Sequence, residues 1–262
     1  MSRTERSFRT AAFILKRRDF GEADRLLTIL TPRYGKLDVI AKGARKPTSS
    51  KTGHVELFTR SDMLIHRGRE LGIAVQAEVL DIYQELREDL QRGAYASYVA
   101  ELIDRFTATD DEDSGMLCDL LAQTFQNLCV DDDPRLAVRY FEICLLDIVG
   151  FRPELHECVI SREKIQAEDQ YFSYAQGGVV RPEHAAQSTS FVPLPMVTLK
   201  VLRHMQRSSY HQVKALTISL PLHDDMERIL LGYITFVLEQ KLQSVDFIRR
   251  VRGFRLEQGP PE

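Results

Sequence analysis

The sequence predicts an α+β protein, with a small closed barrel of five β-strands at the N-terminus and a mainly α-helical domain after it. The first observation is a set of five short segments before residue 80, in which apolar residues nearly alternate or form compact runs between turn residues. The second is that apolar residues after residue 83 recur at spacings of three to five, as on the buried face of a helix. The third is composition: 44% hydrophobic and 28% charged residues in a chain of 262 are typical of a folded globular protein.

The five strands are expected at residues 7–16, 24–31, 36–42, 57–66 and 71–80. Phe13 and Leu15 lie in the near-alternating pattern of the first segment, and Pro32 and Gly35 form a plausible turn after the second. Residues 43–53 have no apolar periodicity and contain basic residues, proline, glycine and serine, which predicts a flexible basic loop. Short strands separated by turn signals favour a small closed barrel.

The helices are expected at residues 83–106, 116–130, 134–149, 196–207 and 224–241, as an antiparallel bundle with short connections. Asp113 or Ser114 is expected to cap the second helix. Asp133 caps the third, Pro134 occupies its first position, and Gly150 ends it. Residues 151–195 are predicted to be an irregular insertion, and residues 251–262 a flexible tail.

Charge is distributed very unevenly along the chain. Residues 1–70 contain 16 Lys or Arg and 8 Asp or Glu, a balance of +8, whereas residues 71–262 contain 19 and 30, a balance of −11. A basic N-terminal segment attracts a polyanion, either a nucleic acid or an acidic protein surface. The alternative that the charge pattern leaves open is a solvated surface whose charges have segregated without function.

The sequence predicts a cytoplasmic protein with no contact to a membrane. The polar N-terminus lacks an apolar stretch followed by a cleavage site, and no apolar run approaches the roughly 18–20 residues needed to span a bilayer. Four cysteines far apart do not make a disulfide framework and are expected to be free thiols in a reducing compartment. They are Cys118, Cys129, Cys144 and Cys158.

We expect no enzymatic activity and no cofactor. The sequence contains no phosphate-binding GxxxxGK[ST] or GxGxxG loop, no GxSxG nucleophile motif and no HExxH zinc motif. One alternative remains, a hydrolase that uses His156 and Cys158, since a thiol beside an imidazole can act as a nucleophile. Two residues that close on an irregular segment do not by themselves produce the required geometry.

The N-terminal third carries a family resemblance. The box FGEADR at residues 20–25, the turn TPRYGK at 31–36 and the segment AKGARKP at 41–47 match, in order and spacing, the start of the bacterial recombination mediator RecO family. The matches continue with LF at 57–58, RGREL at 67–71 and EVL at 78–80. They return at YFExxLLxxxGFxP (140–153) and at FSxxxGG (172–178). The chain thus resembles this family over about residues 7–250.

The resemblance implies an N-terminal OB-type β-barrel over residues 1–80 and a helical domain over 81–250, which often carries a zinc-knuckle insertion. It implies a nucleoid-associated DNA-repair protein that binds single- and double-stranded DNA and anneals complementary strands. The implied partners are the C-terminal tail of the single-stranded DNA-binding protein (SSB) and RecR, with which members help load RecA on gapped DNA. Five short strands and a basic N-terminal segment agree with that implication.

The chain departs from the family where many members carry two CxxC pairs. The matching positions are Cys158, Ser161, Arg181 and His184. A structural zinc ion needs four thiolate or imidazole ligands, and a guanidinium in the third position opposes binding. We therefore expect a metal-free insertion, held by packing of Phe172, Val179 and Val180. His156 remains open as a substitute ligand.

Phosphate contacts require exposed lysine or arginine side chains. The candidate DNA-binding residues are Lys16, Arg17, Arg33, Lys36, Lys42, Arg45, Lys46 and Lys51, with Arg18 in the cluster of Lys16 and Arg17. For Arg25 two roles remain open: a contact with DNA, or an ion pair with an acidic residue of the FGEADR box. Phe20 and Tyr34 are available for stacking on bases, whereas Phe58 is expected in the core. No element resembles a helix that reads the major groove, so no sequence specificity is expected.

The groove for the acidic SSB tail needs apolar walls and cations. Arg135 with Arg139, or Arg203 with Arg207, could supply the cations, and the sequence leaves the two pairs open. The first alternative function is an adaptor whose basic barrel binds acidic protein partners without binding DNA directly.

Overall fold

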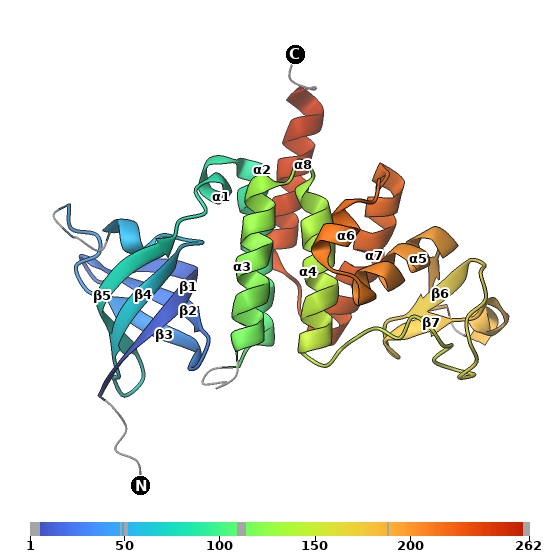
Figure 1. The fold of residues 1–262 in the computed structure, drawn as a ribbon, viewed down its shortest axis with the longest axis horizontal. Helices are drawn as coiled ribbons and strands as arrows, with labels where there is room; N and C mark the ends of the chain where they lie inside the picture. Colours follow the sequence, from blue (N-terminus) through green and yellow to red (C-terminus); the bar gives the residue numbers. More distant parts are fainter. Residues whose placement is uncertain (1–5, 48, 50–51, 109–113, 188, 259–262) are drawn as a thin grey trace, which may run out of the picture. The chain divides into compact units, whose positions relative to one another are not determined.

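The computed structural model describes residues 6–47, 49, 52–108, 114–187 and 189–258. It divides into two compact units: unit 1 combines residues 1–130 with 243–262, and unit 2 comprises residues 131–242. The chain therefore leaves unit 1 after helix α3 (Gly115–Val130) and returns to it at helix α8 (Gln243–Gln258) (Figure 1). The helical region predicted as one domain from residue 81 contributes to both units.

The N-terminal part of unit 1 is a closed five-stranded barrel, as the sequence predicts. Its strands close in the order β1-β2-β3-β5-β4. Neighbours pair antiparallel except β3 and β5, which are parallel, with Val39 opposite Gly72. This is the arrangement of a Greek-key OB barrel. The strands are β1 (Ser7–Phe20), β2 (Asp24–Thr31), β3 (Gly35–Ala41), β4 (Arg60–His66) and β5 (Gly72–Asp81).

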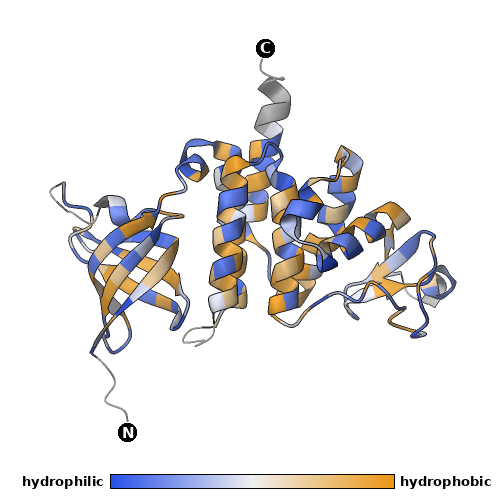
Figure 2. Cartoon of the chain, viewed as in Figure 1, coloured by the Kyte–Doolittle hydropathy of each residue, from blue (hydrophilic) through white to orange (hydrophobic). Residues whose placement is uncertain are grey.

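Alternation along the strands fills the barrel with apolar side chains, and Figure 2 shows polar and apolar residues interleaved along them. Ile14, Leu27, Ile29, Val39 and Met63 are all fully buried there. A short 3₁₀ turn (Thr52–Val55), which the sequence did not predict, precedes β4. It contributes Val55 to the same core, and residues 57–59 that were expected to be strand lie outside β4.

Strand β1 is four residues longer than predicted because it serves two partners. Its first half pairs with β4, from Ser7 opposite His66 to Phe13 opposite Arg60. Its second half pairs with β2 and ends with Phe20 opposite Asp24. A bulge between Ile14 and Lys16 lies at the change of partner. Bulges bend a strand and shift its inside–outside alternation, so the pattern of the first half does not continue into the second.

Among the described residues of unit 1, three helices follow the barrel and a fourth returns to it from the end of the chain. The helix predicted at 83–106 is broken into α1 (Glu85–Glu88) and α2 (Leu90–Phe106). The break is at Asp89, whose extended backbone and side-chain carboxylate cap α2 by accepting bonds from the N–H groups of Gln91 and Arg92. Helix α3 (Gly115–Val130) begins directly after Ser114, one of its two predicted caps; the other, Asp113, lies outside the described residues.

Helix α8 (Gln243–Gln258) corrects the prediction of a flexible tail from residue 251. It packs against α2 and buries Ile248 and Val251. The buried carboxylate of Glu101 on α2 accepts bonds from the backbone N–H groups of Gln243 (3.1 Å) and Ser244 (2.8 Å). Negative charge at a helix N-terminus is stabilising, so α2 supplies the cap that the local sequence of α8 lacks.

Unit 2 is built on α4 (Pro134–Ile148), α5 (Met196–Arg207), α6 (Tyr210–Lys214) and α7 (Leu220–Leu238). Asp133 caps α4 through the N–H of Arg135, and Gly150, with a φ of 82°, follows its end as predicted. Helix α6 was not predicted from the sequence. Helix α7 starts at Leu220, four residues before the predicted start at residue 224.

The predicted irregular insertion contains a three-stranded antiparallel sheet in the order β7-β6-β8. Its strands are β6 (Gln170–Ser173), β7 (Gly178–Val180) and β8 (Val192–Leu194), with a 3₁₀ helix, η2 (Pro182–Gln187), before β8. Phe172, Val179 and Val180 are buried, as expected from the sequence. In the part of the chain that the structure describes, no helix combines the length and apolar character needed to cross a bilayer.

Candidate nucleic-acid interface

The loop after β3 is folded against the turn between β1 and β2. The N–H of Arg45 donates to the carbonyl of Ala23 (2.9 Å), and the carboxylate of Asp24 accepts from the N–H of Gly43 (2.7 Å). Gly43 adopts a φ of +68°, a conformation that side chains with a Cβ disfavour. The FGEADR box thus fixes the backbone of the AKGARK segment, and the first part of the predicted flexible loop has a defined geometry.

Exposed cationic and aromatic side chains gather at this end of the barrel. We call Arg18, Phe20, Lys42, Arg45 and Lys46 the hairpin-end cluster. Phe20 is 41% exposed, and the four cations are also exposed. The Arg45 guanidinium lies 3.3 Å from the carboxylate of Asp19, whereas Arg18, Lys42 and Lys46 have no ion pair or side-chain hydrogen bond with any described residue. Lys51, the last predicted member of this track, lies outside the described residues.

Arg33 and Lys36 lie at the opposite end of the barrel. Strands β2 and β3 pair from Arg25 opposite Ala41 to Thr31 opposite Gly35, and Arg33 is in the turn that joins them. A strand rises about 3.3 Å per residue, so this turn is about 20 Å from the hairpin-end cluster. The structure therefore separates the predicted DNA track into two groups.

Lys16 and Lys36 converge on one carboxylate of α2. The Lys16 ammonium lies 2.6 Å from Asp104 Oδ2 and the Lys36 ammonium 3.3 Å from Asp104 Oδ1. Burial acts to raise the pKa of Asp104, but the two ammonium groups outweigh it and hold the pKa below its usual value. Two cations share one anion, so the group keeps a net positive charge.

Arg17 and Arg25 share Glu56 in the same way. Arg17 pairs with Glu56 Oε2, and Arg25 Nη1 lies 2.7 Å from Glu56 Oε1. The ion pair considered for Arg25 therefore exists, but its partner is Glu56 and lies outside the FGEADR box. Asp24, the nearby acid of that box, bonds to the Gly43 N–H instead.

The aromatic candidates have different surroundings. Phe58 is buried and packs edge-on against Phe125 of α3, which confirms the expectation of a core residue. Tyr34 is half-buried against Phe8, with ring centroids 4.0 Å apart and the Arg67 guanidinium over both rings. Phe20 is the exposed one of the three.

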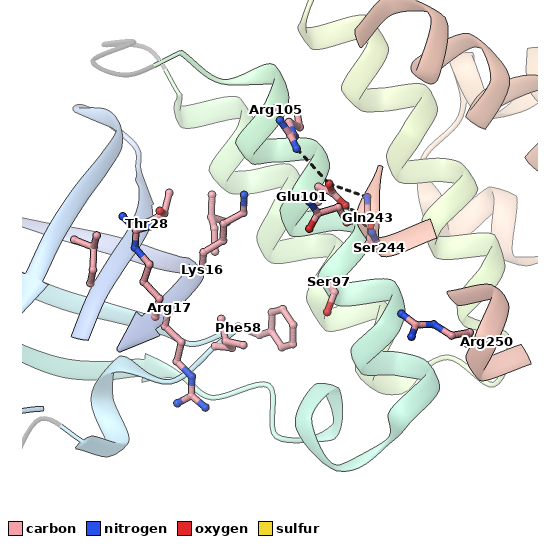
Figure 3. Close-up of a pocket in the computed structure, with 14 residues that line it drawn as sticks. Lys16, Arg17, Thr28, Phe58, Ser97, Glu101, Arg105, Gln243, Ser244 and Arg250 are labelled. Carbon is pink, nitrogen blue, oxygen red and sulfur yellow. Dashed lines mark hydrogen bonds and ion pairs between the residues drawn. The ribbon is translucent and has the colours of Figure 1, made fainter. Parts of the chain in front are cut away.

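A pocket of about 620 Å³ lies between the β1–β2 face of the barrel and helices α2 and α8 of unit 1 (Figure 3). We call it the β1–α2 pocket. Lys16, Arg17, Arg18, Arg105 and Arg250 line it together with one carboxylate, that of Glu101. Leu15, Leu26, Leu57 and Phe58 form its apolar wall. Sequence reasoning missed Arg105 and Arg250, because no local signal brings α2 and α8 to the barrel.

The zinc-knuckle positions of unit 2 do not suit zinc. Arg181 pairs with Glu163 and, at 3.1 Å, with Glu183, so its guanidinium already has anionic partners. Burial acts to raise the pKa of the Cys158 thiol, but backbone N–H groups of residues 160, 161 and 181 hold it below its usual value. His184 lies 3.7 Å from Glu183, and His156 is exposed. The third position of the knuckle is therefore a cation that two carboxylates already engage.

Metal analysis of the purified protein is expected to find well under one zinc per chain, and dialysis against a chelator is expected to leave the melting temperature unchanged. The physical reason is that the positions hold one thiol, one hydroxyl, one guanidinium and one imidazole, and a zinc site requires four deprotonated ligands. One equivalent of zinc that survives dialysis would contradict this.

The arginines considered for an acidic peptide differ in accessibility. Arg139 is 3% exposed and lies 3.2 Å from the buried Glu142, so it belongs to the interior of unit 2. Arg135 is engaged by Asp133 at 2.7 Å. Arg203 donates to the carbonyl of Leu155 at 2.7 Å, and burial lowers its pKa. Arg207 is exposed at the end of α5. Neither pair forms an exposed cationic site.

His156 and Cys158 do not share one environment. Cys158 is fully buried, whereas His156 is exposed and its backbone N–H is bonded to Glu154. A sulfur with no access to solvent cannot reach an external substrate without rearrangement of the loop.

Comparisons with known proteins agree with the resemblance. Residues 1–83 match the family model "Recombination protein O N terminal", and residues 87–246 match "Recombination protein O C terminal". The junction of the two models is close to the boundary predicted at residues 80–81. The chain is 37% identical over 248 residues to the DNA repair protein RecO of a Roseiflexus species, covering 95% of this chain and 87% of the relative. It is 33% identical over 245 residues to that of Dehalococcoides mccartyi (94% and 96% covered) and 32% over 252 residues to that of Desulforamulus reducens (96% and 98% covered).

A five-stranded OB-like barrel followed by a helical region, matched over almost the whole chain by both family models and by these relatives, means that this chain belongs to the RecO family of DNA repair proteins.

Proposed function

We propose that this protein is a recombination mediator that binds single- and double-stranded DNA through the hairpin-end cluster and makes or breaks no covalent bond. The observation that carries the proposal is the set of exposed cations around Phe20 on a loop whose backbone is fixed by Asp24 and Ala23. A pre-ordered cationic surface can neutralise phosphates without a large ordering cost on binding.

The chemistry of this surface suits a ligand of any sequence. Lysine and arginine contact phosphates, and an exposed phenyl ring can stack on any base. Among the described residues of the barrel, no element forms a helix suited to the major groove, so base-specific contacts are not part of the proposal. Arg33, at the other end of the barrel, could hold a second stretch of the same strand or a second strand.

Annealing follows from the same electrostatics. Two complementary strands repel each other through their phosphates, and a surface that neutralises both lowers the barrier to pairing. With RecR, the protein would help load RecA on gaps coated by SSB. A site for the acidic SSB tail remains part of this proposal, and of the four arginines considered for it, Arg207 is the exposed one.

The hairpin-end cations are tested by replacing Lys42, Arg45 and Lys46 with alanine together. The affinity for a fluorescent oligonucleotide duplex should fall by at least about 100-fold near 50 mM salt, and the slope of log K against log salt should flatten by about 2–3. Fluorescence anisotropy over a salt titration measures both, and a strand-annealing assay with and without SSB measures the functional loss.

The matched control removes three exposed cations from unit 2 that no proposed site uses: Lys164, Lys200 and Lys241. It changes the net charge equally, so it should leave the salt slope within experimental error. An unchanged slope in the hairpin-end variant would remove these residues from the interface. Failure of the unaltered protein to bind DNA at low salt would favour the adaptor that binds acidic proteins.

A further inference from the structure

The cations that line the β1–α2 pocket outnumber the carboxylates that pair with them. Five cations line it against the single carboxylate of Glu101. The nearby Asp104 is shared by Lys16 and Lys36, and Glu56 by Arg17 and Arg25. Glu101 is committed to the N-terminus of α8 and to Arg105, 3.8 Å away. Each acid is therefore outnumbered, and the pocket remains electropositive after all these pairs are formed.

The pocket is also continuous with the hairpin-end cluster. Beyond the β1 bulge, Lys16, Arg18 and Phe20 are alternate residues of one strand and are all exposed. Alternate residues point to the same face and are about 7 Å apart, so these three form a line from the pocket to the tip of the hairpin. Arg18 belongs to both surfaces.

The inner wall of the pocket is apolar. Leu26 and Phe58 are almost completely buried, and Leu15 lies beside them. Figure 3 shows Phe58 and Lys16 on the barrel side, with Ser97, Glu101 and Arg250 on the helix side. A volume of about 620 Å³ is within the range of roughly 300–1,000 Å³ found for ligand sites. Apolar wall and cationic rim together match a planar base attached to phosphates.

We propose that the β1–α2 pocket receives a segment of single-stranded nucleic acid, with an unstacked base against the apolar wall and its phosphates on Lys16, Arg18 and Arg250. This rests on the proposed DNA-binding function and adds a second subsite to it. A base inside a duplex cannot enter the pocket without being unpaired, so the subsite favours single strands over duplex.

Neighbouring arginines on α8 provide a matched pair of variants. Arg250 lines the pocket, whereas Arg249 is 69% exposed, 3.8 Å from Asp246, and does not line it. Arg250→Ala should weaken binding of a fluorescent oligothymidine by about 5- to 10-fold near 50 mM salt, the loss of about one phosphate contact. Arg249→Ala, with the same change of charge on the same helix, should leave the affinity within about two-fold.

A second variant tests occupancy without a change of charge. Ser97 of α2 lines the pocket, and Ser97→Phe fills part of it. It should weaken oligothymidine binding but leave the affinity for a blunt duplex unchanged. If the Arg250→Ala and Ser97→Phe variants both bind oligothymidine as tightly as the unaltered protein does, with unaltered thermal melts, the subsite is overturned even if the hairpin-end variant confirms DNA binding.

Two further results separate the possibilities. If the unaltered protein binds neither oligothymidine nor duplex at low salt, the proposed function itself fails. If the pocket variants keep oligothymidine affinity but lose binding of a labelled acidic peptide ending in phenylalanine, the occupant is a peptide and the nucleic-acid inference is wrong. Loss of oligothymidine affinity in both variants, with Arg249→Ala unaffected, supports it.

Discussion

Replacing Phe125 with alanine is expected to destabilise unit 1 by about 3–5 kcal/mol, the range for removing a buried phenyl ring from a close-packed core. Phe125 is fully buried on α3. Its ring is edge-on to Phe13 and Phe58 of the barrel region and to Tyr83, with centroids 5.4–6.3 Å apart. The cavity left by the missing ring should stay largely empty, because its three aromatic neighbours are held in place by the barrel and by the segment before α1. Chemical denaturation followed by fluorescence and circular dichroism measures the loss.

The comparison for this variant is Phe236→Ala on α7. The Phe236 side chain is 50% exposed, so the same chemical change should cost no more than about 0.5 kcal/mol. Natural domains are stable by only about 5–15 kcal/mol, so the Phe125 variant could be largely unfolded at physiological temperature. A cost below about 1 kcal/mol for Phe125→Ala would mean that α3 does not pack on the barrel as described.

The second large effect is expected for Glu142→Ala in unit 2. Glu142 is fully buried on α4, and its Oε1 lies 3.2 Å from the guanidinium of Arg139, itself 3% exposed. The Arg139 guanidinium is 3.9 Å from Glu227, a poorer partner. The Glu142→Ala substitution removes one member of this buried ion pair, and breaking such pairs costs about 3–5 kcal/mol.

The double variant Arg139→Met/Glu142→Leu is the control. It removes both charges and keeps the volume, and buried ion pairs replaced in this way are often neutral or even stabilising. The double variant should therefore recover most of the stability lost in Glu142→Ala, as measured by urea denaturation of the full chain. Equal losses of stability in the single and double variants would show that altered packing, and not the broken ion pair, is responsible.

The sequence correctly predicted those helices and strands whose apolar pattern and end signals lie close together in the chain. Strand β2 begins and ends where alternation and the Pro32 turn place it, and α4 is bounded by Asp133 and Gly150 as expected. The break at Asp89 was missed, since the apolar spacing continues through it, although aspartate is a strong helix cap. Helix α8 was missed because its cap, Glu101, lies more than 140 residues earlier in the chain.

For the candidate site, too, local features were predictable and contacts between distant residues were not. Exposure of Lys42, Arg45 and Lys46 follows from the composition of their segment, and the structure agrees. The pairing of Lys36 with Asp104 could not be predicted, because its partner is 68 residues away and reaches it only through the docking of α2 on the barrel. Long-range ion pairs of this kind change a predicted phosphate contact into part of a shared network, and local sequence patterns do not contain that information.

The discontinuity of unit 1 has a consequence for biosynthesis. The surface of α2 that receives α8 is made early, whereas α8 leaves the ribosome only after residues 131–242 have been translated. At bacterial and eukaryotic elongation rates of about 5–20 residues per second, the nascent unit 1 waits roughly 6–22 s for its last helix. During that interval the docking surface for Ile248 and Val251 is uncovered, so the nascent chain presents a transient binding surface for chaperones.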